Sequence, residues 1–218
     1  RAAAVNLLPG VEISITPEVL IVHSDHQLST LSSALIGEGF LHTRTILNHH
    51  VDLSYSSLNP EQDLDRCADR HGIPRPYIGL MTAAYVDQAR ISIQRAEGIA
   101  AAAVVTAGLG NVSAAGLSPP EGGPPAADTI NIILLMNRAL SRAAKVNAVI
   151  TATEAKTALL QTEGIKTAEG YPATGTSTDA VVIAALNSGP EIRFTGPATT
   201  AGWLIGKAIR EAMGGFLE

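Results

Sequence analysis

The chain of 218 residues is poor in several residue types, and each shortage narrows what it can be. It has one cysteine, Cys67, so no disulfide can form within the chain, which is typical of a reducing compartment. Only 16% of residues are charged, the net charge is −5, and no basic block is present. Such a chain would be repelled by a phosphate backbone, so we expect no nucleic-acid partner.

Long apolar runs are also missing. None reaches the ~18 residues of a membrane span, and no signal-peptide pattern opens the chain. We therefore expect a cytoplasmic protein with no membrane partner. Aromatic residues are scarce at 4%, yet 46% of the sequence is apolar, mainly Ala, Leu, Ile and Val. A core of this size can bury about 70% of the surface of the unfolded chain, and we expect a single domain over residues 1–218.

Hydrophobic periodicity predicts an α+β fold in which a mixed, largely antiparallel sheet packs with a few helices. Short turns between many of the strands favour antiparallel neighbours. Loop 117–128 contains four prolines and two glycines, and residues 138–146 fit either a helix or an extended segment. Strands are predicted within segments 11–24, 27–40, 43–55, 89–108, 129–137, 179–186 and 191–196, and helices at 60–71, 151–164 and 199–216.

Polar clusters follow or precede several of the apolar strands, which is where binding sites are commonly built. They lie at 48–50, 106–111, 129–131, 151–156 and 174–179.

Glu154 and Lys156 allow two interpretations. Glu154 could act as a general base or acid, with Lys156 stabilising an anion. Alternatively, residues 151–154 (Thr-Ala-Thr-Glu) match a capping box, in which Thr151 begins the helix and Glu154 bonds back to its amide. Because the two residues are two positions apart on a helix, their side chains diverge by about 200° and need not address one ligand atom.

The stretch ATGTSTDAVVIAA (173–185) also allows two interpretations. Gly175 can adopt a positive φ, and the amides around it could form an oxyanion-binding concavity. Thr176 and Ser177 are hydroxyl nucleophiles if a base such as Asp179 lies in reach. The alternative is a hydroxyl-rich turn that simply starts a strand.

The histidines do not predict a metal site. His49 and His50 are adjacent, so on a strand they point to opposite faces, and no other pair has zinc-ligand spacing. Asn111 and Asn131 could orient a substrate amide or could serve as turn residues.

The polar segments, taken in order, resemble the adenosylcobinamide amidohydrolase family (CbiZ). The segments are LSSALIGEG (31–39), ILNHHV (46–51), TAGLGN (106–111), TINIILLMN (129–137), TATEAKTALL (151–160), ATGTSTDAVVIAA (173–185) and TGPATTAGWLIGKAI (195–209). The resemblance implies hydrolysis of the amide between the corrin ring and the aminopropanol arm of adenosylcobinamide. The products would be adenosylcobyric acid and the amino alcohol, a step of corrinoid salvage for cobalamin synthesis.

For such a reaction we expect a broad cleft and no protein cofactor, because cobalt would arrive within the corrinoid substrate. The chain could form a homo-oligomer. Glu154 is the first choice for general base and acid. The candidate catalytic residues are Glu154, Thr176, Asp179 and His49, and the candidate substrate-binding residues are Asn111, Asn131, Lys156, Thr174, Gly175, Ser177 and Thr178.

Two other functions are left open. A corrinoid-binding or delivery protein would keep the cleft without chemistry, and an unrelated amidase would use a Thr or Ser nucleophile. The acidic residues in the motifs favour an enzyme, since a carrier needs no buried carboxylate.

Overall fold

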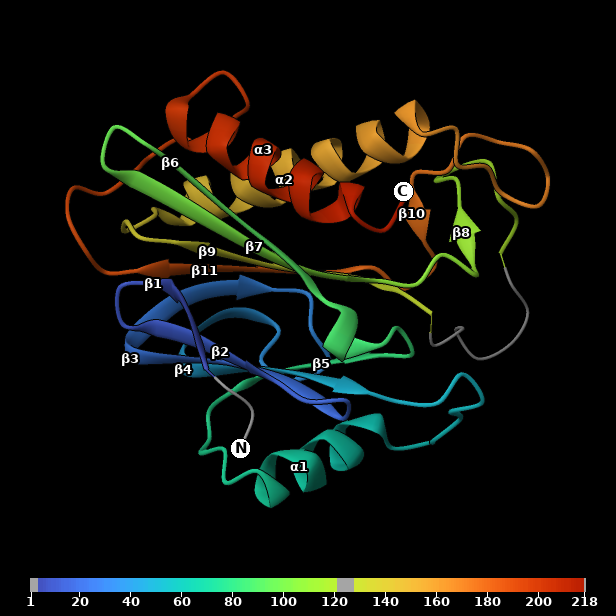
Figure 1. Ribbon diagram of the computed structural model, residues 1–218, viewed down its shortest axis with the longest axis horizontal. Helices are drawn as coiled ribbons and strands as arrows, with labels where there is room; N and C mark the ends of the chain where they lie inside the picture. Colours follow the sequence, from blue (N-terminus) through green and yellow to red (C-terminus); the bar gives the residue numbers. More distant parts are fainter. Residues whose placement is uncertain (1–3, 121–127, 218) are drawn as a thin grey trace.

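A nine-stranded sheet forms the framework of the computed structural model, which describes residues 4–120 and 128–217 (Figure 1). A two-stranded sheet and three α-helices accompany it in the described part of the chain. The elements are β1 (Val5–Leu8), β2 (Val11–Ile15), β3 (Val19–Ser32), β4 (Gly39–His50), α1 (Pro60–Arg70), β5 (Ile78–Thr82), the 3₁₀ helix η1 (Val86–Gln88), β6 (Arg90–Ala96), β7 (Ile99–Ala107), β8 (Val112–Ser113), β9 (Ile130–Met136), α2 (Arg142–Thr162), β10 (Gly175–Thr176), β11 (Ala180–Leu186) and α3 (Thr200–Gly214).

The long strand β3 joins two parts of the large sheet. Its first half pairs with β2, its second half pairs with β11, and β4 runs along its other edge. Strands β6, β7 and β9 continue beyond β11, so the sheet folds over into two layers (Figure 1). The pairs β9–β11 and β4–β5 are parallel and the other pairs of this sheet are antiparallel. The predicted α+β fold with a largely antiparallel sheet is therefore confirmed.

Apolar side chains fill the spaces between four layers. Helices α2 and α3 cover one face of the β6–β7–β9–β11 layer, and α1 covers the outer face of β4 and β5 (Figure 1). Strand β9 is buried on both faces: Ile132 and Leu134 pack toward the helices, while Ile133 and Leu135 pack toward the other sheet layer. This explains the apolar run from Ile132 to Met136, since burying each such side chain contributes about 1.5–3 kcal/mol.

Several local predictions are confirmed. Strands β2 and β3 flank the turn at Pro17, and α1 occupies Pro60–Arg70. Strands β6 and β7 are joined by Glu97 and Gly98, whose φ angles of 53° and 73° are those of a tight hairpin turn.

Two predicted elements are wrong. The capping box at 151–154 does not start a helix, because α2 already begins at Arg142, where the Ser141 hydroxyl accepts from the Ala144 amide. Thr151 lies within α2 and donates its hydroxyl to the Thr195 carbonyl. Residues 191–196 form no strand. Their pairing with another segment is limited to one isolated β-bridge between Ile192 and Leu140. Of the predicted loop 117–128, residues 121–127 lie outside the described residues.

Candidate functional site

A cleft opens between the two sheet layers, at the end where β4 and β5 finish and β9 and β11 begin. It has a volume of about 540 Å³, within the range of small-molecule sites. Apolar surface dominates its walls, although seven of the lining residues carry a hydroxyl and one carries an amide. The lining residues are Ser33, Ala34, Leu35, Val51, Tyr55, Ser56, Ser57, Leu58, Pro60, Leu80, Met81, Thr82, Thr129, Asn131, Thr178 and Ala180.

Asn131 is held in the cleft wall by a buried polar network. Its amide nitrogen donates to the side-chain oxygen of Asn48 and to the Met81 carbonyl, each at 3.1 Å. Asn48 in turn donates to the Thr106 hydroxyl at 3.0 Å. Because all three side chains are almost fully buried, this network fixes the cleft wall across both sheet layers.

Thr129 presents a different situation on the same wall. It is 3% exposed, and its hydroxyl has no hydrogen-bond partner among residues 4–120 and 128–217. A buried hydroxyl without a partner costs about 1–3 kcal/mol, so this position is suited to a polar group supplied by a ligand.

Asp179 is the centre of a second constellation, on the helix side of the same strand ends. One carboxylate oxygen accepts from the backbone amides of Ile130 and Thr176, at 3.2 and 3.1 Å, and from the Thr176 hydroxyl. The other oxygen accepts from the Lys156 ammonium, whose side chain is 8% exposed. The Thr176 hydroxyl is thus bonded to a carboxylate that also forms an ion pair with a lysine. No other hydroxyl among the described residues has this combination of partners.

Gly175 makes this arrangement possible in a way the sequence did not suggest. Its φ is not in the positive range, contrary to the expected left-handed turn. A Cβ at this position would instead lie 2.2 Å from an Asp179 oxygen and 2.6 Å from the Lys156 nitrogen. Glycine is therefore required for close approach. Because the Thr176 amide is already bonded to Asp179, that amide does not face an open oxyanion pocket.

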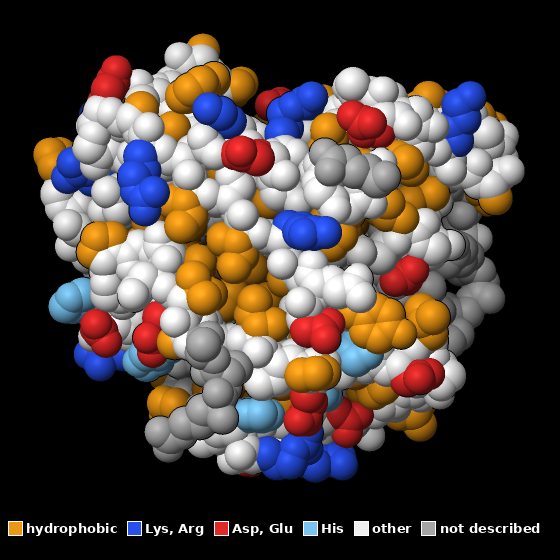
Figure 2. All heavy atoms as spheres, in the orientation of Figure 1, with side chains coloured by type: hydrophobic (Ala, Val, Ile, Leu, Met, Phe, Trp, Pro, Cys, Tyr) orange, Lys and Arg blue, Asp and Glu red, His pale blue; other side chains and the backbone are white. Residues whose placement is uncertain are grey.

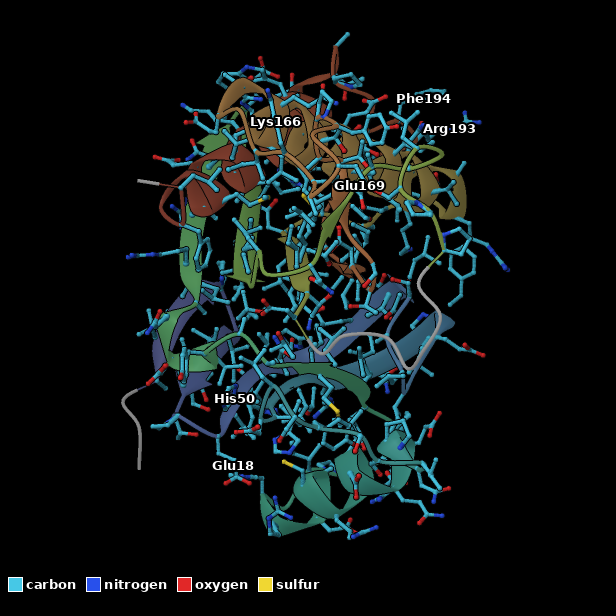
Figure 3. The ribbon with its side chains drawn as sticks, turned by 90° about the vertical axis from the view of Figure 1, so that its right-hand side faces the viewer. Glu18, His50, Lys166, Glu169, Arg193 and Phe194 are labelled. Atoms are coloured by element: carbon cyan, nitrogen blue, oxygen red, sulfur yellow. The ribbon has the colours of Figure 1, made fainter. Side chains whose placement is uncertain are left out.

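The loop that carries Asp179 lies between the cleft and a second hollow. Thr178 lines the cleft, whereas Ser177 lines the hollow, where the Asn111 side chain donates to its hydroxyl at 2.9 Å. Thr174 anchors the loop by accepting from the Ala115 amide. Glu169 also lines the hollow and lies in the helical part of the molecule (Figure 3). The structure thus brings six of the predicted residues together around Asp179: Asn111, Lys156, Thr174, Gly175, Thr176 and Ser177.

Glu154 lies apart from this constellation. It is exposed on the outer side of α2, in a groove between α2 and α3 that Trp203 and Lys207 also line. Lys156, two positions later, points instead into the sheet edge and contacts Asp179. The divergence expected for this spacing on a helix is confirmed, and Glu154 is left without a place in either polar network of the site.

His49 also lies elsewhere, under α1. Its Nδ1 is 3.2 Å from the Glu18 carbonyl and 3.5 Å from the sulfur of Cys67, whereas His50 faces the Ala84 carbonyl and stacks on Tyr85. The predicted divergence of the two histidines is thus confirmed. Burial lowers the pKa of His49 and raises the pKa of the Cys67 thiol to about 11.

Three residues of the site were not singled out from the sequence. Asn48, Thr106 and Thr129 belonged to noted clusters without a role, and Thr129 stands two positions before Asn131, just ahead of β9, where both residues line the cleft. That period of two was a usable signal for Thr129. The pairing of Asn48 with Asn131 had no such signal, because it depends on the packing of β4 against β9.

An α+β fold with an apolar cleft and a lysine–carboxylate–hydroxyl constellation is typical of a protein that acts on a small molecule. Comparison with known proteins gives the family. The family model for adenosylcobinamide amidohydrolase (CbiZ) matches residues 5–216. The chain belongs to this family and is a hydrolase acting on an amide bond.

Two curated relatives agree with this assignment. A protein of Methanosarcina mazei named adenosylcobinamide amidohydrolase is 32% identical over 95% of this chain and 98% of its own length. A protein of the same name from Halobacterium salinarum is 38% identical over 64% of this chain and 58% of its own length.

A solved structure, the PH0078 protein of Pyrococcus horikoshii, is aligned with 92% of this chain and 77% of its own, with 13% identity and a TM-score of 0.46. Among the described residues, no helix is long and apolar enough to cross a membrane.

Proposed function

We propose that the chain hydrolyses the amide between the corrin ring and the aminopropanol arm of adenosylcobinamide, releasing adenosylcobyric acid for corrinoid salvage. The observation that carries this proposal is the family match, which spans almost the whole chain. Cobalt would enter and leave as part of the corrinoid.

The cleft between the sheet layers suits the body of such a substrate. A corrinoid is broad, apolar and rimmed by amides, and the cleft offers apolar walls with the hydroxyl of Thr129 and the side chain of Asn131. The arm that carries the scissile amide would then reach around the ends of β9 and β11. There Thr178 and Asp179 are consecutive residues, the first lining the cleft and the second holding Thr176.

In the proposed reaction, the Thr176 oxygen attacks the carbonyl carbon of the amide and its proton passes to Asp179. That proton then goes to the departing amine, so the C–N bond breaks and an ester on Thr176 remains. Water hydrolyses the ester and restores the hydroxyl. Lys156 is a positioning residue, since it holds the Asp179 carboxylate and its charge in place. This assignment replaces Glu154, the first choice from the sequence.

The experiment is incubation with adenosylcobinamide, with chromatography and mass spectrometry of the products. We expect adenosylcobyric acid and aminopropanol in equal amounts. Corrinoid binding without cleavage would favour the delivery protein, and absence of both would contradict the proposal.

Variants then locate the chemistry. Thr176→Val should abolish turnover, and Thr176→Ser should retain part of it, because serine keeps the hydroxyl. Glu12→Gln is the matched control. Glu12 is exposed on β2 and contributes no side chain to either polar network of the site. If Glu154→Gln abolished turnover while Thr176→Val did not, the reaction centre would lie at Glu154 instead.

A further inference from the structure

A cluster of metal-ligating side chains lies at the opposite side of the molecule, beside α1. It consists of Glu18 from the β2–β3 turn, Cys67 from α1 and His71 from the C-terminal end of α1. One oxygen, one sulfur and one nitrogen of these residues lie within 4.8 Å of one another. Figure 3 shows Glu18 beside α1, far from Lys166 and Glu169 at the other end. The cluster is separate from the proposed reaction centre, and the inference does not rest on the proposed function.

The spacing of these atoms is close to that of a tetrahedral zinc site. Zinc bonds of about 2.0–2.3 Å at tetrahedral angles separate neighbouring ligand atoms by about 3.3–3.7 Å. The His71 Nε2 and Glu18 Oε2 atoms are 3.6 Å apart. Cys67 and His71 are four positions apart on one helix, so their side chains leave the same face. Side-chain rotations that move the ligand atoms by about 1 Å would bring the other separations, which are all within 4.8 Å, into this range.

Neighbouring residues already orient the cluster. Arg70 donates to Oε1 of Glu18 at 2.6 Å, which leaves Oε2 turned toward His71. His49 adds a further nitrogen 3.5 Å from the Cys67 sulfur. A second shell that fixes a ligating carboxylate is a usual feature of metal sites.

The charges also fit a divalent ion. A Cys67 thiolate and the Glu18 carboxylate neutralise two positive charges, while the guanidinium of Arg70 is about half exposed and screened by solvent. Figure 2 shows basic and acidic side chains gathered at the lower edge of the molecule, where α1 lies in Figure 1. Ion pairs that join Arg75 to Asp65 and Asp69 belong to this charged surface of α1.

We propose that Glu18, Cys67 and His71 bind a zinc ion that clamps α1 to the β2–β3 turn. The mixed sulfur, nitrogen and oxygen donors favour zinc over the oxygen-seeking ions Mg²⁺ and Ca²⁺. On binding, the thiol proton passes to solvent and a sulfur–zinc bond forms. The fourth position is open to water, as in zinc sites with three protein ligands.

Cobalt(II) is the probe, because it occupies zinc sites and is coloured. Cys67 is the only cysteine, so any thiolate-to-cobalt charge-transfer absorption must come from it. We expect this absorption to saturate at one cobalt per chain, to disappear when zinc is added, and to be absent in Cys67→Ser. His71→Ala and Glu18→Gln should each weaken zinc affinity by at least about tenfold.

The matched control is His42→Ala, which removes an exposed histidine of β4 outside the cluster and should leave zinc affinity unchanged. Absence of the charge-transfer absorption in the wild-type protein would overturn the proposal. So would zinc affinity that is equal in wild type, His71→Ala and Glu18→Gln, because the cluster would then be only an ion-pair network around Arg70.

Discussion

The ion pair between Lys156 and Asp179 gives the sharpest prediction for stability. Both side chains are largely buried, at 8% and 14% exposure, so removing one partner leaves the other charge poorly solvated. Breaking a buried pair in this way costs about 3–5 kcal/mol. Asp179 keeps two backbone amides and the Thr176 hydroxyl when Lys156 is lost, so we expect the lower end, about 3 kcal/mol, for Lys156→Met. For a chain of this length that is a fall in Tm of about 6–12 °C.

A double-mutant cycle separates pairing from side-chain loss. In Lys156→Met with Asp179→Asn both charges are gone, and the asparagine oxygen can still accept the amide hydrogen bonds. We expect the double variant to be at least about 2 kcal/mol more stable than the sum of the single effects predicts, measured by urea unfolding followed by circular dichroism. The exposed pair Arg75–Asp69 is the control, with a coupling below about 1 kcal/mol. Additive effects at 156 and 179 would refute the reasoning.

Three further predictions test particular features. Gly175→Ala should cost about 1–3 kcal/mol in urea unfolding, because its Cβ meets Asp179, whereas Gly196→Ala, with open space around its Cβ, should change stability by less than about 1 kcal/mol. Thr129→Val removes a buried hydroxyl without a partner among the described residues, so stability should not fall, while KM for adenosylcobinamide should rise about fivefold; an unchanged KM would exclude Thr129 from binding. Burial lowers the pKa of Lys145, so near its pKa the unfolded chain binds more protons at this residue, and the contribution of Lys145 to the unfolding free energy should rise with pH up to about 10.4. Lys145→Met should remove that rise, and an identical pH profile in both proteins would contradict this assignment.

Local patterns were sufficient to predict most elements. The hairpin at Glu97–Gly98, helix α1 and strands β9 and β11 each have a periodicity or turn signal contained within their own segment. The start of α2 was not predicted, because Thr151 with Glu154 forms the complete capping-box pattern, whereas Ser141 is followed three positions later by Ala144. The nine helical residues before Thr151 were decided by packing of Ala144 and Ala148 against the sheet.

The site was predictable in part for the same reason. Lys156, Gly175, Thr176 and Asp179 were named from two segments, but their contact depends on how α2 crosses the end of β11. Glu154 had the better chemical motif, yet helix geometry turns it to the outer groove. Which of two neighbouring polar residues faces the sheet is set by tertiary packing, which a short motif does not contain.

The most direct test of the account is single-turnover cleavage of adenosylcobinamide by Asp179→Asn, with corrinoid binding followed by absorbance in the same samples. The account predicts binding close to that of the wild-type protein, because the cleft is unchanged. It predicts cleavage slowed by at least about 100-fold, because the proton acceptor for Thr176 is lost. Cleavage at the wild-type rate would contradict the assignment of the reaction centre to Thr176 and Asp179.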